Sequence, residues 1–192
     1  MLTLIEGSVA LKPTIYKLRI TLADIDRDHY DSLGLTIARH PSETLERMMA
    51  RVLAFCMNAR ETLLFTKGLA AVEEPDIWAR TLDDRISLWI DVGEPLVDRI
   101  KKASRVSPVV KVYSFNSKSD AWWSQAREKF NGLGGVSVFQ FHWQSVQALA
   151  ALAKRTMDLS VTITDGTAYV AAGTGECEVV WSVLQESGLE EN

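Results

Sequence analysis

The chain has 192 residues, of which 47% are hydrophobic and 24% charged, and its formal net charge is −4. This composition is typical of a globular domain and excludes a disordered chain, a collagen and a coiled-coil rod. No apolar run approaches the ~18 residues of a membrane-spanning helix, and the net charge does not favour a general nucleic-acid or membrane binder. We therefore expect one compact domain over residues 1–192.

The sequence also indicates the compartment. Residues 1–10 carry Glu6 where a signal peptide would have a basic region followed by an apolar stretch, which argues against secretion. Cys56 and Cys177 lie far apart and lack the CxxC spacing of a metal or redox site. We expect a cytoplasmic protein with reduced thiols, and the irregular spacing of its three histidines makes a structural zinc site improbable.

The first third of the chain predicts a hairpin followed by a helix. Residues 14–22 alternate apolar and polar side chains, as a half-buried strand does, and residues 33–38 are the expected partner strand. Apolar residues then recur at helical spacing up to about Asn58, namely Leu45, Met48, Met49, Val52, Leu53 and Cys56. Projected onto that helix, Glu46 lies at the edge of the apolar stripe and Glu43 nearly opposite it.

The rest of the chain alternates strands and helices. We predict strands at 63–65, 77–82, 86–92, 109–115 and 136–141, and helices at 95–104, 121–130 and 144–155. Thr164–Thr167, with Asp165-Gly166 at its centre, predicts a hairpin in the tail, which closes with a strand at 178–183. Crossover helices between strands imply parallel pairing, so the fold class is α/β or α+β with a compact mixed sheet and flanking helices.

Charge is unevenly distributed along the middle of the chain. Residues 73–98 hold eight acids against two arginines, whereas residues 99–118 hold six basic residues and no acid. Adjoining solvated faces are the common explanation of such runs. A carboxylate cluster beside a cationic cluster also suits metal-assisted chemistry on phosphates, because the acids bind a divalent cation and the basic residues bind phosphate oxygens.

Within these runs, Asp76 and Asp91 are the strongest candidates for a site. They are placed to point into one cleft from neighbouring strands, and a third acid, Glu46 or Glu43, can come from the preceding helix. Carboxylates with retained waters suit Mg²⁺ or Mn²⁺, and Asp91 ends an apolar run in which an unpartnered acid is costly. Lys101 and Lys102 are candidates to assist an attacking water, although solvated helix lysines are the commoner case.

Several motifs together give the chain a resemblance to a known family. They are Arg39-His-Pro-Ser-Glu-Thr44, Glu46-Arg-Met-Met49, Leu88-Trp-Ile-Asp-Val-Gly93, Arg99-Ile-Lys-Lys-Ala103, Tyr113-Ser-Phe-Asn-Ser117 and Arg155-Thr-Met157. In this order they resemble the YaeQ family of bacterial proteins, from about residue 10 to about residue 184. The resemblance implies a compact fold around a variant of the PD-(D/E)XK nuclease core (restriction-endonuclease-like) with additional β-hairpins.

Carried over by position, Pro75-Asp76 resembles the PD element and Asp91 the D/E element. The lysine expected two residues after Asp91 is absent, because residue 93 is glycine. Some members of the superfamily carry this lysine on a nearby helix, which here would be Lys101 or Lys102. Asp83 or Asp84 is the alternative to Asp91, and Glu46, with Glu43 as its alternative, resembles the additional helical acid of many members.

Two functional hypotheses follow. The first is a Mg²⁺- or Mn²⁺-dependent phosphodiester hydrolase acting on DNA or RNA, in which Arg39, Arg47, Arg99 and Arg105 contact the nucleic acid and Trp122 or Trp123 could stack on bases. The second is a non-catalytic protein that has kept the nuclease scaffold and binds a nucleic-acid end or the transcription machinery. It is motivated by Gly93 and the negative net charge.

Overall fold

The computed structural model describes residues 12–187, so residues 1–10, whose sequence argues against a signal peptide, lie outside the described part. The strands are β1 (Thr14–Asp24), β2 (His29–Arg39), β3 (Leu63–Phe65), β4 (Ile77–Arg80), β5 (Ile86–Val92), β6 (Val109–Ser114), β7 (Val136–Phe141), β8 (Thr156–Thr164), β9 (Thr167–Ala172) and β10 (Gly175–Gln185). The helices are α1 (Leu45–Met57), α2 (Val97–Val106), α3 (Ser119–Phe130) and α4 (Trp143–Ala151), with a 3-10 turn at Gly68–Ala70.

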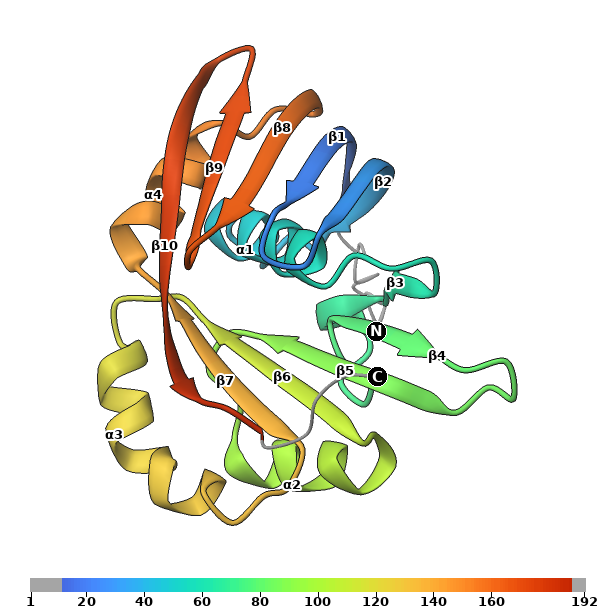
Figure 1. Cartoon of the computed structure of the whole chain (residues 1–192), viewed down its shortest axis with the longest axis vertical. Coiled ribbons are helices and arrows are strands. Elements are labelled where there is room, and N and C mark those ends of the chain that lie inside the picture. The colour runs from blue at the N-terminus through green and yellow to red at the C-terminus, as the bar shows by residue number, and fades with distance from the viewer. Residues whose placement is uncertain (1–11, 188–192) are drawn as a thin grey trace, which may run out of the picture.

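The ten strands form one large, strongly curved sheet in the order β2-β1-β8-β9-β10-β7-β6-β5-β4-β3 (Figure 1). Pairing is parallel for β1–β8, β5–β6 and β6–β7, and antiparallel elsewhere. The predicted mixed sheet with flanking helices is confirmed at the level of an α+β fold. Within residues 12–187 no helix is long and apolar enough to cross a membrane.

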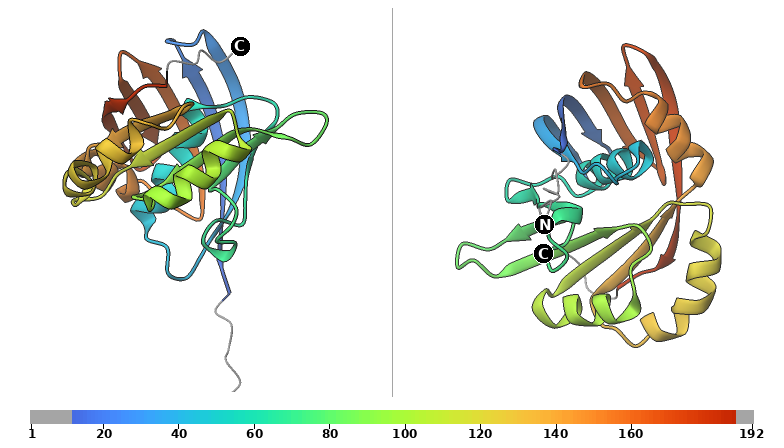
Figure 2. Two further views of the ribbon diagram at one scale, coloured as in Figure 1. Left: turned by 90° about the horizontal axis from the view of Figure 1, so that it is seen from below. Right: turned by 180° about the vertical axis from the view of Figure 1, so that it is seen from behind.

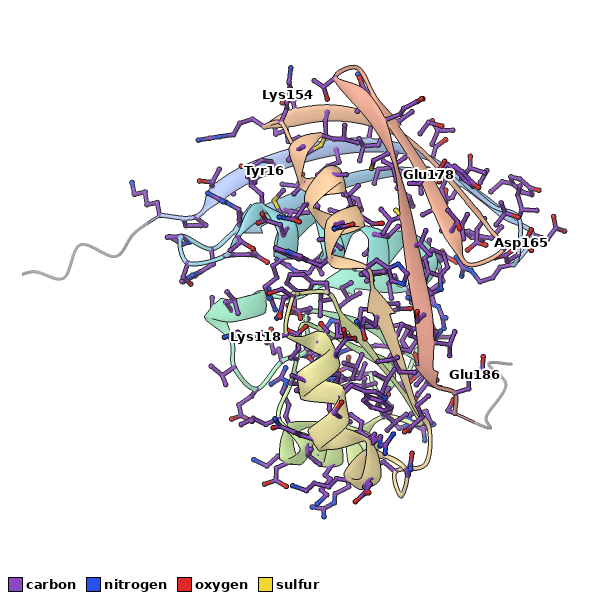
Figure 3. The ribbon with its side chains drawn as sticks, turned by 90° about the vertical axis from the view of Figure 1, so that its left-hand side faces the viewer. Tyr16, Lys118, Lys154, Asp165, Glu178 and Glu186 are labelled. Atoms are coloured by element: carbon purple, nitrogen blue, oxygen red, sulfur yellow. The ribbon has the colours of Figure 1, made fainter. Side chains whose placement is uncertain are left out.

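Strand β10 divides the sheet into two halves. Its first part pairs with β9 and its second part with β7, with a register shift between Val183 and Gln185. The half that contains β2, β1, β8 and β9 is the upper one in Figure 1. There, β1 and β8 alternate buried apolar with exposed side chains, as predicted for strands that have one solvent-exposed face. Figure 3 shows Tyr16, Lys154, Asp165 and Glu178 in this half, and Lys118 and Glu186 in the other.

Helix α1 lies between the two halves (Figure 2). Its residues 48–56 are all buried, in a core shared with strands of both halves. Thr44 caps this helix, since its Oγ1 accepts a hydrogen bond from the Arg47 N–H at 3.2 Å. A second core lies on the other face of β5–β7, where Trp89 and Val112 pack beneath α2 and α3.

Several predicted boundaries needed correction. Helix α4 ends at Ala151 instead of Arg155, because β8 already begins at Thr156, opposite Lys17 of β1. Strand β4 ends at Arg80, which leaves Leu82 fully exposed in the turn to β5. Strands β3, β5 and β7 have the predicted bounds, because each is a short apolar run between turn residues.

Candidate functional site

Asp76 is the residue immediately before β4, and its backbone N–H donates a hydrogen bond to the Ile90 carbonyl oxygen of β5. Its side chain is only 5% exposed. Oδ2 accepts a hydrogen bond from the Val92 N–H at 2.8 Å, and Oδ1 accepts one from Arg47 Nη2 at 2.7 Å. Arg51 Nε lies 3.6 Å from the same Oδ1. The predicted PD aspartate is therefore a buried carboxylate held between a backbone amide and the arginines of α1.

Those two arginines also bind Glu43. Glu43 Oε1 accepts from Arg47 Nη1 at 2.7 Å and from Arg51 Nη1 at 2.9 Å. Burial alone would lower the pKa of Arg47, but the charges of Asp76 and Glu43 outweigh it and raise this pKa. The cluster thus holds two acids and two arginines, a set of buried groups whose formal charges balance.

The predicted position of Glu43 was wrong. The helical projection placed it opposite the apolar stripe, yet its side chain is among the most buried acids. The helix begins at Leu45, so Glu43 precedes it and does not follow its periodicity. Instead, the chain before the Thr44 cap folds the carboxylate back beneath Arg47 and Arg51.

Asp91, in β5, is held by one arginine of α2. Arg99 donates from Nε to Oδ2 at 2.7 Å and from Nη2 to Oδ1 at 2.8 Å, a bidentate pair. Asp91 as a residue is 3% exposed, and burial raises the pKa of its carboxyl, which the Arg99 hydrogen bonds and charge partly offset. Arg99 also donates to the carbonyl oxygens of Val72 and Glu74, so it connects β5 to the segment that precedes β4.

Asp76 and Asp91 line one cleft of about 620 Å³. Its charged lining residues are Glu46, Arg47, Glu74, Asp76, Asp91, Glu94 and Arg99, five acids against two arginines. Its other walls include Leu69, Val72, Pro95, Phe115 and Trp143. An acid-rich cleft of this size attracts cations, and its volume lies within the usual range for small-ligand sites.

The other predicted residues divide between this cleft and other surfaces. Glu46, half-buried, lines the cleft. Lys101 and Lys102 do not line it: Lys101 Nζ lies 3.8 Å from Asp98 on the surface, and Lys102 is exposed. Helix α2 buries Ile100 and Ala103 against the sheet, which turns both lysines away.

The remaining candidates lie elsewhere. Arg39 donates to the Glu43 carbonyl oxygen at 3.2 Å. Arg105 lines a separate hollow near the end of α2. Asp83 and Asp84 lie in the β4–β5 turn, where Asp83 pairs with Arg85 and Asp84 with Arg80. Asp91, and neither of those two turn residues, is the acid beside Asp76.

Gly93, at the position of the expected lysine, has a backbone that favours glycine. Its φ is +122°, a conformation that side chains other than glycine rarely adopt. A Cβ atom there would lie 3.9 Å from the Phe115 ring. The backbone that brings Val92 to Asp76 therefore leaves little opportunity for a lysine at this position.

Sequence reasoning missed Glu94, Phe115 and Trp143. Glu94 accepts hydrogen bonds from the N–H groups of Phe115 and Asn116 and, at 2.6 Å, from Ser119 Oγ, so it fixes the end of β6 against the start of α3. The sequence does carry a signal for Glu94, which is an acid directly after the glycine that follows the apolar strand β5. Trp122 and Trp123 instead pack against Phe130, away from the cleft.

Carboxylate oxygens are the ligands of hard divalent cations, and here those of Asp76 and Asp91 are bound by Arg99, by Arg47 and by the Val92 N–H. In the described part of the chain no group of three or more His, Cys, Asp or Glu side chains is arranged to hold a metal ion. Mg²⁺, however, is commonly held by one or two carboxylates, with waters and substrate phosphates completing its shell. Asp76 and Asp91 are two carboxylates on one wall of the cleft, the number of protein ligands that such a site uses.

Comparison with known proteins identifies the family. Residues 9–181 match the sequence model described as YaeQ protein. The chain belongs to the YaeQ family. It is 40% identical over 179 residues to YaeQ of Escherichia coli (strain K12), and likewise to YaeQ of Salmonella typhi, covering 93% of this chain and 99% of each relative.

Solved YaeQ structures share the fold. The crystal structure of the YaeQ protein from Xanthomonas axonopodis pv. citri superposes with a TM-score of 0.88 at 34% identity, covering 90% of this chain and 98% of that one. The Pseudomonas syringae YaeQ structure gives 0.87 at 35% identity, with 91% and 97% covered. The fold described above is thus that of YaeQ proteins solved by crystallography.

Proposed function

We propose that this YaeQ protein is a metal-dependent phosphodiester hydrolase of the nuclease type, acting on DNA or RNA. One observation carries the proposal: Asp76 and Asp91, with fourteen residues between them in sequence, come together as buried carboxylates on the wall of one acid-rich cleft. Buried acids are costly unless they are partnered, and clefts that concentrate them are typical of functional sites.

The order of elements supports a variant of the PD-(D/E)XK core. An antiparallel pair, β4–β5, carries both aspartates, and two crossovers through α2 and α3 add β6 and β7 in parallel. Helix α1 precedes this unit and contributes Arg47 and Glu46 to the same cleft. Pro75-Asp76 and Asp91 thus lie on neighbouring segments of the sheet, as the PD and D/E parts of the PD-(D/E)XK motif require, and the lysine of the motif has no counterpart.

In this proposal Asp76 and Asp91 hold Mg²⁺ or Mn²⁺, with Glu46 at the edge of the cleft. When bound, such an ion polarises the scissile phosphate and lowers the pKa of a coordinated water. Arg47 and Arg99 take the role that sequence reasoning gave to Lys101 and Lys102. Their guanidinium groups already line the cleft, and guanidinium binds phosphate oxygens in a bidentate manner.

A specific observation favours a second candidate, a non-catalytic binding protein on the same scaffold. Arg99 occupies both oxygens of Asp91, Arg47 and Val92 occupy those of Asp76, and position 93 is glycine. Such a protein would bind a nucleic-acid end or a component of the transcription machinery through the cleft, with the ion pairs serving to hold its walls together.

Calorimetric titration of Mn²⁺ into the protein tests the proposal, with and without a short oligonucleotide. Asp76→Asn and Asp91→Asn keep the shape of each side chain and remove its charge. Asp83→Asn is the matched control, an exposed acid paired with Arg85 outside the cleft. We expect the wild type and Asp83→Asn to bind Mn²⁺ and the two cleft variants to lose binding, with folding checked by circular dichroism.

Cleavage of single- and double-stranded DNA and RNA is then assayed with the same four proteins. Metal-dependent cleavage that both cleft variants lose supports the hydrolase. Metal binding unchanged in folded Asp91→Asn would overturn it. Oligonucleotide binding without metal, retained by both cleft variants, would favour the non-catalytic protein.

A further inference from the structure

One wall of the cleft is aromatic. Phe115 follows β6 and is 7% exposed, whereas Trp143, the first residue of α4, is half-buried. Their ring centroids lie 6.5 Å apart at an interplanar angle of 36°, and both rings line the cleft. Because Phe115 is buried beneath it, the indole of Trp143 is the aromatic surface of this pair that a ligand can reach.

The aromatic wall lies close to the acids. Gly93 is two residues after Asp91, and the position of its missing Cβ is 3.9 Å from the Phe115 ring. Glu94 then binds the Phe115 N–H at 3.1 Å, which fixes this ring relative to the end of β5. Asp91, Gly93, Phe115 and Trp143 all line the same cleft, so a ligand that fills it can contact both the acids and the aromatic wall.

Cleft size and charge restrict the ligand. A cleft of about 620 Å³ has the size of a small-ligand site, so it can take an unpaired nucleotide but not the two paired strands of a duplex. Five acids against two arginines repel an anion, so a phosphate can enter only with a cation. A flat aromatic surface beside such a position suits a planar base, because every nucleobase offers a π face for stacking.

We infer that the cleft takes single-stranded nucleic acid, with one base stacked on Trp143 and a phosphate of the same strand beside Asp76 and Asp91. This inference rests on the proposed function, since the phosphate is placed by the cation that the two aspartates hold. Stacking on an aromatic ring is tolerant of sequence, so the cleft selects for an unpaired strand and little for base identity. Trp143 is thus a residue that determines specificity, without a part in the bond-breaking step.

Calorimetry with a 5′-phosphorylated thymidine trinucleotide in the presence of Mn²⁺ tests this inference. Two further probes are an abasic oligomer with the same phosphates and a blunt-ended duplex. The variants are Trp143→Ala and Trp143→Phe, with Trp123→Ala on α3 as the control tryptophan outside the cleft. We expect Trp143→Ala to weaken binding at least about fivefold and Trp143→Phe and Trp123→Ala to keep most of the affinity.

The outcomes separate this inference from the proposed function. Stacking is supported if Trp143→Ala loses as much affinity for the trinucleotide as the wild type loses when the abasic oligomer replaces the trinucleotide. Equal affinity of Trp143→Phe, Trp143→Ala and the wild type, or binding of the duplex as tightly as the trinucleotide, would overturn the inference while leaving the metal site intact. Trinucleotide binding that needs Trp143 but is equally tight without Mn²⁺ would overturn the placement of the phosphate at a cation held by Asp76 and Asp91, and would favour the non-catalytic protein.

Discussion

Two regions of the molecule contain the same ion pair in opposite surroundings. Arg99 binds Asp91 in the cleft through two hydrogen bonds of 2.7 and 2.8 Å, and Arg19 of β1 binds Asp158 of β8 through two of 2.5 and 2.9 Å. The Asp91 side chain is 5% exposed and that of Asp158 is 67% exposed. Burial raises the pKa of Asp91, whereas the hydrogen bond from Arg19 lowers the pKa of Asp158.

The comparison shows that geometry alone does not make an ion pair important. On the outer face of β1 and β8, solvent stabilises both charges whether they pair or not, and the pair adds little. In the cleft, Asp91 depends on Arg99 because no solvent replaces it. We assign the function to the cleft, where burial disfavours the charges that its residues carry. The exposed face of β1 and β8 is ordinary sheet surface.

The largest effect is expected from Arg99→Met, which leaves Asp91 buried without its partner. Breaking a buried pair costs 3–5 kcal/mol, and because Arg99 is partly exposed we expect about 3 kcal/mol. Urea unfolding measures the loss. The double variant Arg99→Met with Asp91→Leu should recover most of it, and a loss no larger than that of an exposed pair would contradict the burial of the charge.

A smaller effect of definite sign is expected from pH. A raised pKa in the folded state means that Asp91 favours folding most when it is protonated, and that this contribution is lost as pH rises from the ordinary value of about 3.9 through the raised value. We therefore measure the free energy of unfolding of the wild type and of Asp91→Asn from pH 4 to 8. The value for the wild type should fall relative to that of Asp91→Asn as pH rises. Parallel curves would contradict the raised pKa.

The smallest effect is expected at Arg19 and Asp158. Arg19→Met should leave the urea midpoint unchanged within error at high salt, since exposed charges are screened. The pH dependence of stability should have the opposite sign at Asp158. Because the pKa of Asp158 is lowered in the folded state, its contribution to stability is present above its ordinary pKa and is lost as the solution is acidified, and comparison with Asp158→Asn measures it. A pH dependence with the same sign as that of Asp91 would remove the contrast between the two regions.

The sequence predicted those parts of the fold that depend on local patterns. Strand β5 had the predicted bounds because its residues form an apolar run between turns, and Asp91 was conspicuous as an acid ending that run. The alternation in β1 correctly placed one face of the hairpin in the core. Asp76 was singled out by the proline before it and by its spacing from Asp91.

The partners of these acids depend on tertiary structure. Arg47 reaches Asp76 across 29 positions of sequence, and Glu43 is buried because the chain folds back before α1 begins. Lys101 follows Arg99 by two residues, yet the helical turn places one in the cleft and the other at the surface. Trp143 lines the cleft because α4 starts beside the end of β6, which no local pattern encodes.

Strand β10 has a consequence for how the protein is made. It is the last strand along the described chain, and it pairs with β9 through Gly175–Val180 and with β7 through Trp181–Gln185. Until these residues leave the ribosome, both neighbouring strands present an open edge, which is a site for pairing with other chains. Neither half of the sheet is therefore complete as a separate folding unit before β10 is made, and the nascent chain depends on this strand to cover an edge of both halves at once.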